Sequence, residues 1–264
     1  MTKPIVRGVD HVYVPLSDAQ AAYSVLTATL GLPIAWPYTA YGDFASGGVN
    51  LGSLNLEVLN DSNVDSPARV QGIALHPVAT DQLVAELDHR GIAHSQPEIF
   101  PPGASKDTGA MWTNVTLERL SKPTTTVFTC EYHIPELYDY DSRQASLDEA
   151  GGGTLGLIGV QEIVISSPQP TQAIHQWQQL LDPTSPRGRG YWELEHGPAL
   201  RIIAGTVDTV HHVVVMVRSL AAIEQSRSVL VQALHGLTIR FVQSERSAAP
   251  PPRRSNGATI QPMT

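Results

Sequence analysis

The chain has 264 residues and a formal net charge of −8 at pH 7, with 42% hydrophobic and 16% charged residues. A chain of this length can form one large domain or two smaller ones, each with its own core. The acidic balance argues against a nucleic acid partner, because binding to the phosphate backbone requires clustered Lys and Arg.

Cysteine content and hydropathy bear on the compartment. The single cysteine, Cys130, excludes an intramolecular disulfide and is typical of a reducing environment. The N-terminus lacks an apolar stretch of signal-peptide length, and no run reaches the length of a membrane-spanning helix. We therefore expect a cytoplasmic protein that acts on a small molecule and not on a membrane.

The first predicted element is a strand in VRGVDHVYVPL (residues 6–16), which is rich in β-branched residues and precedes a predicted helix. Alternation places His11 and Tyr13 on one face of this strand, and Asp10 on the other face with Val12 and Val14. A lone strand histidine is more often a hydrogen-bonded or exposed side chain than a ligand. The meaning of His11 therefore depends on the other strands.

A second strand, SLNLEVLN (residues 53–60), alternates cleanly between apolar and polar positions. Leu54, Leu56 and Val58 share one face, and Glu57 lies on the other. A glutamate in the middle of a strand is costly to bury unless it is paired or coordinated. Glu57 is therefore a candidate site residue.

The strand TVFTCEYHIP (residues 126–135) repeats this pattern, with Cys130 beside Phe128 on the apolar face and Glu131 opposite. We expect Cys130 to be a buried, inert thiol. If the polar faces of the three strands line one concave sheet, then His11, Glu57 and Glu131 converge. Such nitrogen and oxygen donors suit a divalent metal ion such as Mn, Ni, Zn or Fe.

The chain also repeats itself. GVDHVYVPLSD (residues 8–18) reappears as GVQEIVISSPQ (residues 159–169), and a strand–helix unit follows in each half, at residues 72–92 and 211–237. A glycine-rich segment, DEAGGGTLG (residues 148–156), separates the halves. We predict an α+β protein with two tandem domains, residues 1–147 and 155–264, each built from two strand–helix–strands modules.

Four segments carry a resemblance to a known family: GVDHVYVPLSDAQAAYSVLTATLGLP, LNLEVLN, GIALHPVATDQLVAELDHRGI and FTCEYHIPEL. They resemble the vicinal oxygen chelate superfamily, which includes glyoxalase I, extradiol dioxygenases, fosfomycin-resistance enzymes and metal-free bleomycin-binding proteins. The resemblance implies paired βαβββ modules that form a half-open barrel, with metal ligands on the first and last strands of each module. His11, Glu57 and Glu131 fall on three of those four positions.

The remaining positions depart from this pattern. Gly72 occupies the fourth ligand position and offers no side chain, and His76 lies farther along the same strand, at the rim of the expected site. The corresponding positions of the second half hold Glu162, Arg201 or Ile203, and His212. Of these residues, only His212 fully matches the type of metal ligand expected at its position. We therefore expect the second half to be a structural partner of the first half, or one wall of the cup-shaped site.

The resemblance implies a metal-dependent enzyme in which the ion acts as a Lewis acid and Glu57 or Glu131 acts as the base. One histidine and two glutamates favour isomerase or lyase chemistry on a small substrate with adjacent oxygens. Two alternatives stay open: an Fe(II) extradiol-type dioxygenase, and a metal-free binding or resistance protein. The binder would use an aromatic groove, for which the candidates are Tyr13, Trp36, Tyr38, Tyr41 and Trp112. A homodimer is also left open.

Overall fold

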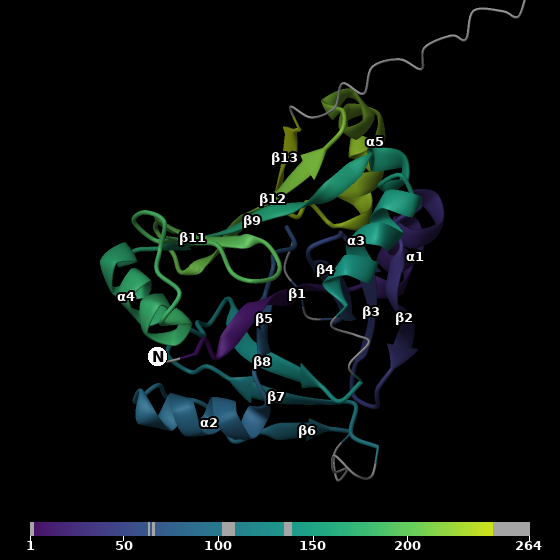
Figure 1. Cartoon of the computed structure of the whole chain (residues 1–264). Coiled ribbons are helices and arrows are strands. Elements are labelled where there is room, and N and C mark those ends of the chain that lie inside the picture. The colour runs from purple at the N-terminus through teal and green to yellow at the C-terminus, as the bar shows by residue number, and fades with distance from the viewer. Residues whose placement is uncertain (1–2, 63, 65–66, 102–108, 135–138, 245–264) are drawn as a thin grey trace, which may run out of the picture.

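The computed structural model describes the chain except for residues 1–2, 63, 65–66, 102–108, 135–138 and 245–264. Two mixed β-sheets form the molecule, one of eight strands and one of five (Figure 1). Helix α4 lies at one side of this view, and α1, α3 and α5 gather at the other. The α+β class predicted from the sequence is confirmed.

The first sheet contains two βαβββ modules, as predicted. The first module comprises β1 (Val6–Leu16), α1 (Ala19–Ser24), β2 (Ile34–Ala40), β3 (Ala45–Asn50) and β4 (Asn55–Asn60), and α1 continues as a π-helical turn, Val25–Thr29. The second comprises β5 (Gly72–Pro77), α2 (Thr80–His89), β6 (Glu98–Phe100), β7 (Trp112–Thr116) and β8 (Thr126–Tyr132). The strand order is β2-β3-β4-β1-β5-β8-β7-β6, so β1 and β5 lie at the centre.

The second sheet has fewer strands than the first within the described residues. It contains β9 (Leu157–Ser167), α4 (Pro170–Leu181), β10 (Tyr191–Trp192), β11 (Ala199–Ala204), β12 (Thr209–Val217), α5 (Leu220–Ala233) and β13 (Ile239–Gln243), with strand order β10-β11-β9-β12-β13. The segment GATIQP (residues 257–262), for which the sequence predicts a final strand, lies outside the described residues. Helix α3 (Tyr140–Glu149) and a 3₁₀ turn (Gly153–Leu155) connect the sheets.

Strands β1 and β9 are equivalent, as the repeated sequence predicts. Each pairs in parallel with the last strand of its module, β4 or β11, and antiparallel with the opening strand of the next, β5 or β12. The change of sheet falls between Tyr132 and Leu157. One continuous apolar cluster runs through both halves, however, and the two domain boundaries stay a prediction.

A β-bulge interrupts β1. Val9 pairs with Leu75 and His11 with Ala74, so Asp10 is an extra residue that has no partner on β5. A bulge redirects a side chain away from strict alternation. The prediction that Asp10 and His11 lie on opposite faces is wrong for this reason, because the Asp10 carboxylate turns back toward the His11 ring.

The alternation of β4 matches the prediction. Leu54, Leu56 and Val58 are buried in the apolar cluster, whereas Glu57 faces the concave side of the sheet. A fully buried apolar side chain of this kind contributes about 1.5–3 kcal/mol to folding. The apolar positions of this strand therefore determine which face Glu57 presents.

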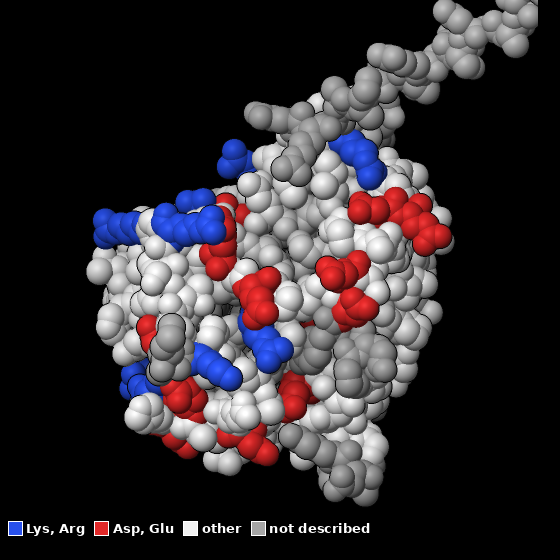
Figure 2. All heavy atoms as spheres, viewed as in Figure 1, with Lys and Arg blue, Asp and Glu red and all other residues white. Residues whose placement is uncertain are grey.

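The outside of the molecule carries both signs of charge. Acidic and basic side chains are interspersed on the face shown in Figure 2, and a basic group lies at its left edge, over the region of α4 and β11. Among the described helices, none has the length and apolar character that a membrane span requires.

Candidate functional site

A cavity of about 490 Å³ lies against the concave side of the first sheet. This volume is within the usual range of small-molecule sites. Aromatic side chains form much of its wall: Tyr13, Trp36, Tyr41, Phe44, Trp112 and Phe128. Of the aromatic residues predicted to line a groove, Tyr38 is absent from this wall and packs against Tyr23 instead.

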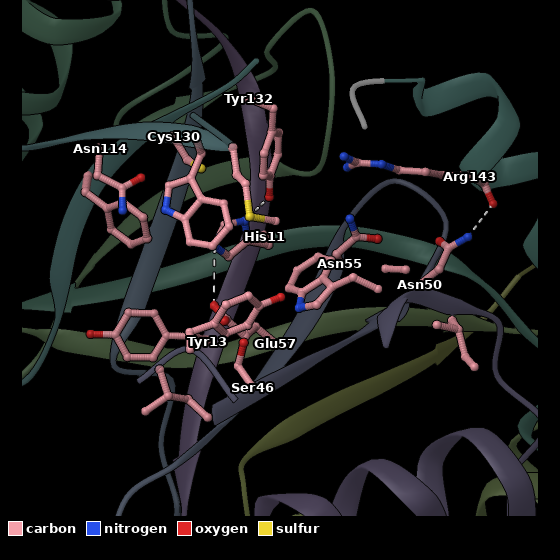
Figure 3. A pocket seen from close by; sticks show the side chains of 18 of the residues that line it. His11, Tyr13, Ser46, Asn50, Asn55, Glu57, Asn114, Cys130, Tyr132 and Arg143 are labelled. Atoms are coloured by element: carbon pink, nitrogen blue, oxygen red, sulfur yellow. Dashed lines mark hydrogen bonds and ion pairs between the residues drawn. The ribbon is translucent and has the colours of Figure 1, made fainter. Parts of the chain in front are cut away.

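His11 lies at the centre of the cavity floor (Figure 3). Its side chain is 6% exposed, and its Nδ1 is 2.7 Å from Oδ2 of Asp10. The rings of Trp36 and Phe128 contact its imidazole edge-on, at centroid distances of 5.7 and 5.8 Å. A carboxylate on Nδ1 selects the tautomer with the proton on that nitrogen, so Nε2 is left to face the cavity.

Asp10 is completely buried and has two further partners. Nη2 of Arg143 lies 2.7 Å from its Oδ1, and the Tyr132 hydroxyl donates to its Oδ2 at 3.0 Å. Burial by itself raises the pKa of Asp10. The hydrogen bond from His11 and the positive charge of Arg143 outweigh this effect and hold the pKa well below its usual range. Asp10 is therefore a carboxylate at neutral pH.

Two side chains that contact Asp10, those of Tyr132 and Arg143, both keep their protons and so complement its negative charge. Burial, together with the charge of Asp10, raises the pKa of the Tyr132 hydroxyl well above its ordinary value, so this group remains a donor. Burial lowers the pKa of Arg143, but the adjacent Asp10 carboxylate more than offsets this effect and the pKa is raised. A buried charge is tolerated only when it is paired in this way.

Glu57 approaches His11 from β4, as predicted. Its Oε2 lies 3.5 Å from Nε2 of His11, and its side chain is 13% exposed. The dashed line in Figure 3 joins these two groups across the cavity floor. An imidazole nitrogen without a proton and a carboxylate oxygen are both proton acceptors, so the pair can take up a proton from a bound molecule and return it.

The structure separates Glu131 from this pair. Glu131 lies on the opposite face of β8, where its Oε2 accepts a hydrogen bond from the backbone N–H of Thr80 at 2.9 Å, in the first turn of α2. A carboxylate is favourable there because it meets an unpaired N–H and the positive end of the helix dipole. The prediction that Glu131 joins His11 and Glu57 at one site, as ligand or as base, does not hold in this structure.

The cavity face of β8 is instead its more apolar face, with Phe128, Cys130 and Tyr132. The alternation along this strand was predicted correctly, but the face assigned to the site was the wrong one. Cys130 is buried, as predicted. Burial raises the pKa of its thiol well above the ordinary value, which keeps it protonated.

The second module of the first half does not complete a metal site. Gly72 stands as far before α2 as His11 stands before α1, and a Cβ at Gly72 would lie 1.8 Å from the ring of Tyr13. By strand pairing, Phe128 corresponds to Glu57. Gly72 and Phe128, the two positions of the second module that match His11 and Glu57, therefore lack a side chain that could bind a metal ion.

A catalytic metal centre usually has three protein ligands in addition to water. In the described part of the chain, no group of three or more His, Cys, Asp or Glu side chains is placed to hold a metal ion. His11 and Glu57 make two. The residues of this cavity therefore do not fit the predicted divalent metal ion.

The other histidines considered from the sequence lie elsewhere. His76 is buried against Tyr140 and His196, outside the cavity lining. His212 lies in the second half, where its Nδ1 is 2.7 Å from that of His211.

The positions of the second half that match His11 and Glu57 hold Glu162 and Arg201, which form an ion pair with each other. The guanidinium of Arg201 also lies over the ring of Tyr191. The charges at these two matched positions therefore neutralise each other.

Sequence reasoning missed Asp10, Tyr132 and Arg143. The acidic neighbour of His11 was visible, but strict alternation directed it away from the site. Arg143 lies on α3, beyond both modules, and reaches the cavity only through the packing of that helix against the first half, as Figure 3 shows. No local pattern in the sequence of α3 marks this residue.

Comparison with known proteins identifies solved structures with a similar fold. No family model and no curated protein sequence matches the chain. A hypothetical protein from Staphylococcus aureus matches at 14% identity over 90% of this chain and 99% of the other, with a TM-score of 0.58. Homoprotocatechuate 2,3-dioxygenase from Arthrobacter globiformis matches at 14% identity over 86% of this chain and 69% of the other, with a TM-score of 0.50.

A Mn(II)-bound glyoxalase from Novosphingobium aromaticivorans matches at 14% identity over 87% of this chain and 71% of the other, with a TM-score of 0.49. Identities at this level show a shared fold and do not show a shared activity. The structural neighbours are proteins of the vicinal oxygen chelate superfamily, and this chain has the fold of that superfamily.

Proposed function

We propose that the chain is an enzyme that transfers a proton on a small, largely apolar molecule, as an isomerase or lyase does. The observation that supports this proposal is the arrangement of His11. Its Nδ1 is held by the buried carboxylate of Asp10, and its Nε2 faces Glu57 on the floor of the cavity. Two acid–base groups in contact at the base of a pocket are typical of proton-transfer sites.

In the proposed reaction, Nε2 of His11 removes a proton from the bound molecule, and the imidazolium, with Glu57 beside it, returns the proton to a neighbouring atom. Asp10 orients the imidazole and stabilises the imidazolium that forms. The pKa of Asp10 lies well below its usual range, so Asp10 remains ionised and does not take the proton itself. Arg143 and Tyr132 hold the carboxylate in place.

The walls indicate the type of substrate. Trp112 and Tyr41 line the cavity and meet edge-on, and Phe100, which is not among the lining residues, stacks on Trp112 at a centroid distance of 4.2 Å. Flat, rigid walls of this kind favour a planar molecule. We propose a planar substrate with an acidic C–H or O–H bond, of which the acidic end lies at His11.

Hydrogen exchange tests this function with a set of candidate substrates. The protein is incubated in D₂O with a panel of small planar carbonyl compounds and phenyl ketones, and loss of C–H signals is followed by NMR. We expect catalysed exchange for a subset of the panel, abolished in His11→Gln and strongly reduced in Asp10→Asn. Panel members that bind but show no exchange above the buffer rate would contradict proton transfer.

The aromatic wall also supports a second candidate, a protein that sequesters a drug-sized molecule. The same panel separates the two functions, because a sequestering protein retains its ligand unchanged and its affinity does not depend on His11. Oxygen uptake that follows turnover would support the dioxygenase alternative instead.

A further inference from the structure

A loop of the second half, residues 195–197, extends the first sheet. Strand β4 pairs with β1 only from His11 onward, so the edge of β1 before His11 is free of β4. The loop occupies this edge. The backbone N–H of His196 donates to the carbonyl of Arg7 at 3.0 Å, and the N–H of Val9 donates to the carbonyl of His196 at 3.3 Å.

Two glycines permit this contact. A Cβ at Gly8 would lie 2.3 Å from the carbonyl oxygen of His196, which no side chain tolerates. Gly197 has a φ of +81°, and a Cβ there would lie 2.4 Å from the carbonyl oxygen of Val9. The loop can therefore approach β1 this closely only because both positions are glycine.

The side chain of His196 continues toward the site. Its ring stacks on Tyr140 at a centroid distance of 4.6 Å and an angle of 8°. The guanidinium of Arg143 lies 4.7 Å from the centre of the same tyrosine ring, and Arg143 donates to Asp10. Contacts thus lead from the second half to the carboxylate that orients His11.

The Tyr140 ring is held from a further direction. His76 is buried beside it, with its Nδ1 3.4 Å from the tyrosine hydroxyl. A long arginine side chain has many rotamers, and stacking on a fixed aromatic ring selects among them. The geometry of Arg143 at Asp10 therefore depends on how firmly Tyr140 is held.

We propose that His196 is a positioning residue, through which the second half orders Arg143 against Asp10 and thereby sets the orientation of His11. The importance of this role for turnover rests on the proposed function. The structural relay itself does not require that function. In this interpretation the second half is part of the site's support, although none of its described residues lines the cavity.

The test compares His196→Leu, which removes the ring but keeps bulk, with His196→Phe, which keeps a stacking ring. The matched control is His211→Ala, which removes an exposed histidine of the same half. The readouts are the guanidinium N–H signals of Arg143 and the ring Nδ1–H signal of His11 in NMR spectra of the full chain. Arg143→Met and His11→Gln assign these signals, and backbone amide signals report the fold.

We expect both signals to be sharp and slow to exchange with water in the native protein, in His196→Phe and in His211→Ala. In His196→Leu we expect the Arg143 signals to broaden and Nδ1–H exchange at His11 to accelerate at least tenfold, with the backbone signals retained. Unchanged signals in His196→Leu would overturn the proposal. Equal loss in His196→Phe would overturn it too, because stacking would then not be the cause.

Turnover provides a second readout once an exchanging substrate is known. Because His196 does not line the cavity, His196→Leu should lower kcat by roughly ten- to a hundredfold and leave KM unchanged. If His11→Gln leaves exchange intact, the proposed function fails, and the NMR comparison still decides the relay. If His11→Gln abolishes exchange and His196→Leu retains full kcat, the relay fails and the proposed function stands.

Discussion

The two halves of the chain use the same pair of strand positions in opposite ways. In the first half, His11 on β1 and Glu57 on β4 face a cavity of about 490 Å³ and approach to 3.5 Å. In the second half, the matching residues on β9 and β11 are Glu162 and Arg201, which form an ion pair. A histidine and a carboxylate can exchange a proton, whereas a carboxylate and a guanidinium neutralise each other. One duplicated scaffold thus carries a candidate reactive pair in one copy and a paired charge in the other.

The residue before each pair shows the same contrast. Asp10 precedes His11 in a bulge and is completely buried, whereas its counterpart Gln161 is exposed. Strand β9 has the same bulge at Gln161, so the residue in the bulge, and not the bulge itself, adds a buried anion to the first half. The experiments that follow probe this difference, ordered from the largest expected effect to the smallest.

Replacing Asp10 by Asn should have the largest effect. The change leaves the buried Arg143 without its carboxylate, and breaking a buried pair costs about 3–5 kcal/mol. Chemical denaturation should show this loss for Asp10→Asn and less than about 0.5 kcal/mol for the matched variant Gln161→Ala. Equal losses in the two variants would mean that the residue in the bulge does not distinguish the halves.

Asp10 should also make the free energy of unfolding depend on pH in the acidic range. Its folded pKa lies below its ordinary value of 3.8, so the unfolded chain takes up this proton at a higher pH than the native protein. The stabilisation is therefore complete above pH 3.8 and is lost as the pH falls below it. The pH dependence should be visibly flatter in Asp10→Asn, as measured by denaturation between pH 5 and 2.

Phe128→Glu should supply one of the two metal ligands that the second module lacks. Native protein should show no change in Tm on addition of Mn²⁺, Zn²⁺ or Ni²⁺, because no three His, Cys, Asp or Glu side chains of the described residues are placed to hold a metal ion. A third ligand, the carboxylate introduced at position 128, should produce a stabilisation of about 2–3 kcal/mol at metal concentrations near a hundred times Kd.

The matched variant Phe128→Gln lacks the charge and should show no such increase in Tm. Stoichiometric metal in the native protein, measured by elemental analysis after purification without chelators, would contradict the difference between the two modules.

His76 should make stability depend on mildly acidic pH. Burial lowers its pKa from 6.5 to about 4, so the unfolded chain binds a proton between these values and the native protein does not. Stability should be complete above pH 6.5 and fall by roughly 1–3 kcal/mol as the pH drops toward 4. His76→Gln should remove this slope. His212→Gln, in the less enclosed environment of the second half, should leave it largely in place.

The smallest effect is expected for Arg201→Met. This side chain is 41% exposed, and ion pairs with exposed members contribute about 0–1 kcal/mol. Denaturation should show a loss of less than about 1 kcal/mol, far below that of Asp10→Asn. A loss as large as that of Asp10→Asn would show that the second-half pair is also a buried structural element.

Much of the first half could be predicted because its patterns are local. The alternation in SLNLEVLN assigned Glu57 to the concave face, and β4 confirms this assignment. The repeat of GVDHVYV in GVQEIVI predicted two equivalent central strands, and β1 and β9 have the same pairing. These predictions succeed because burial of apolar side chains at every second position fixes a strand's two faces.

The errors arose where a residue's role depends on a distant partner. Glu131 was assigned to the site from its own strand, but the N-terminus of α2 supplies its partner. A strand with a polar and an apolar face does not indicate which face meets a cavity, since an aromatic cavity wall is itself apolar.

By itself, the sequence determined the fold class, the duplication and the residues that share a face of the strand around Glu57, because each follows from short-range alternation and repeated order. Tertiary structure alone decided which carboxylate supports His11. The bulge in β1 turned Asp10 toward the ring, and helix α3, from outside both modules, brought Arg143 to neutralise it. The physical reason is that a buried charge requires its partner at a few ångströms in space, and spacing along the chain does not specify that distance.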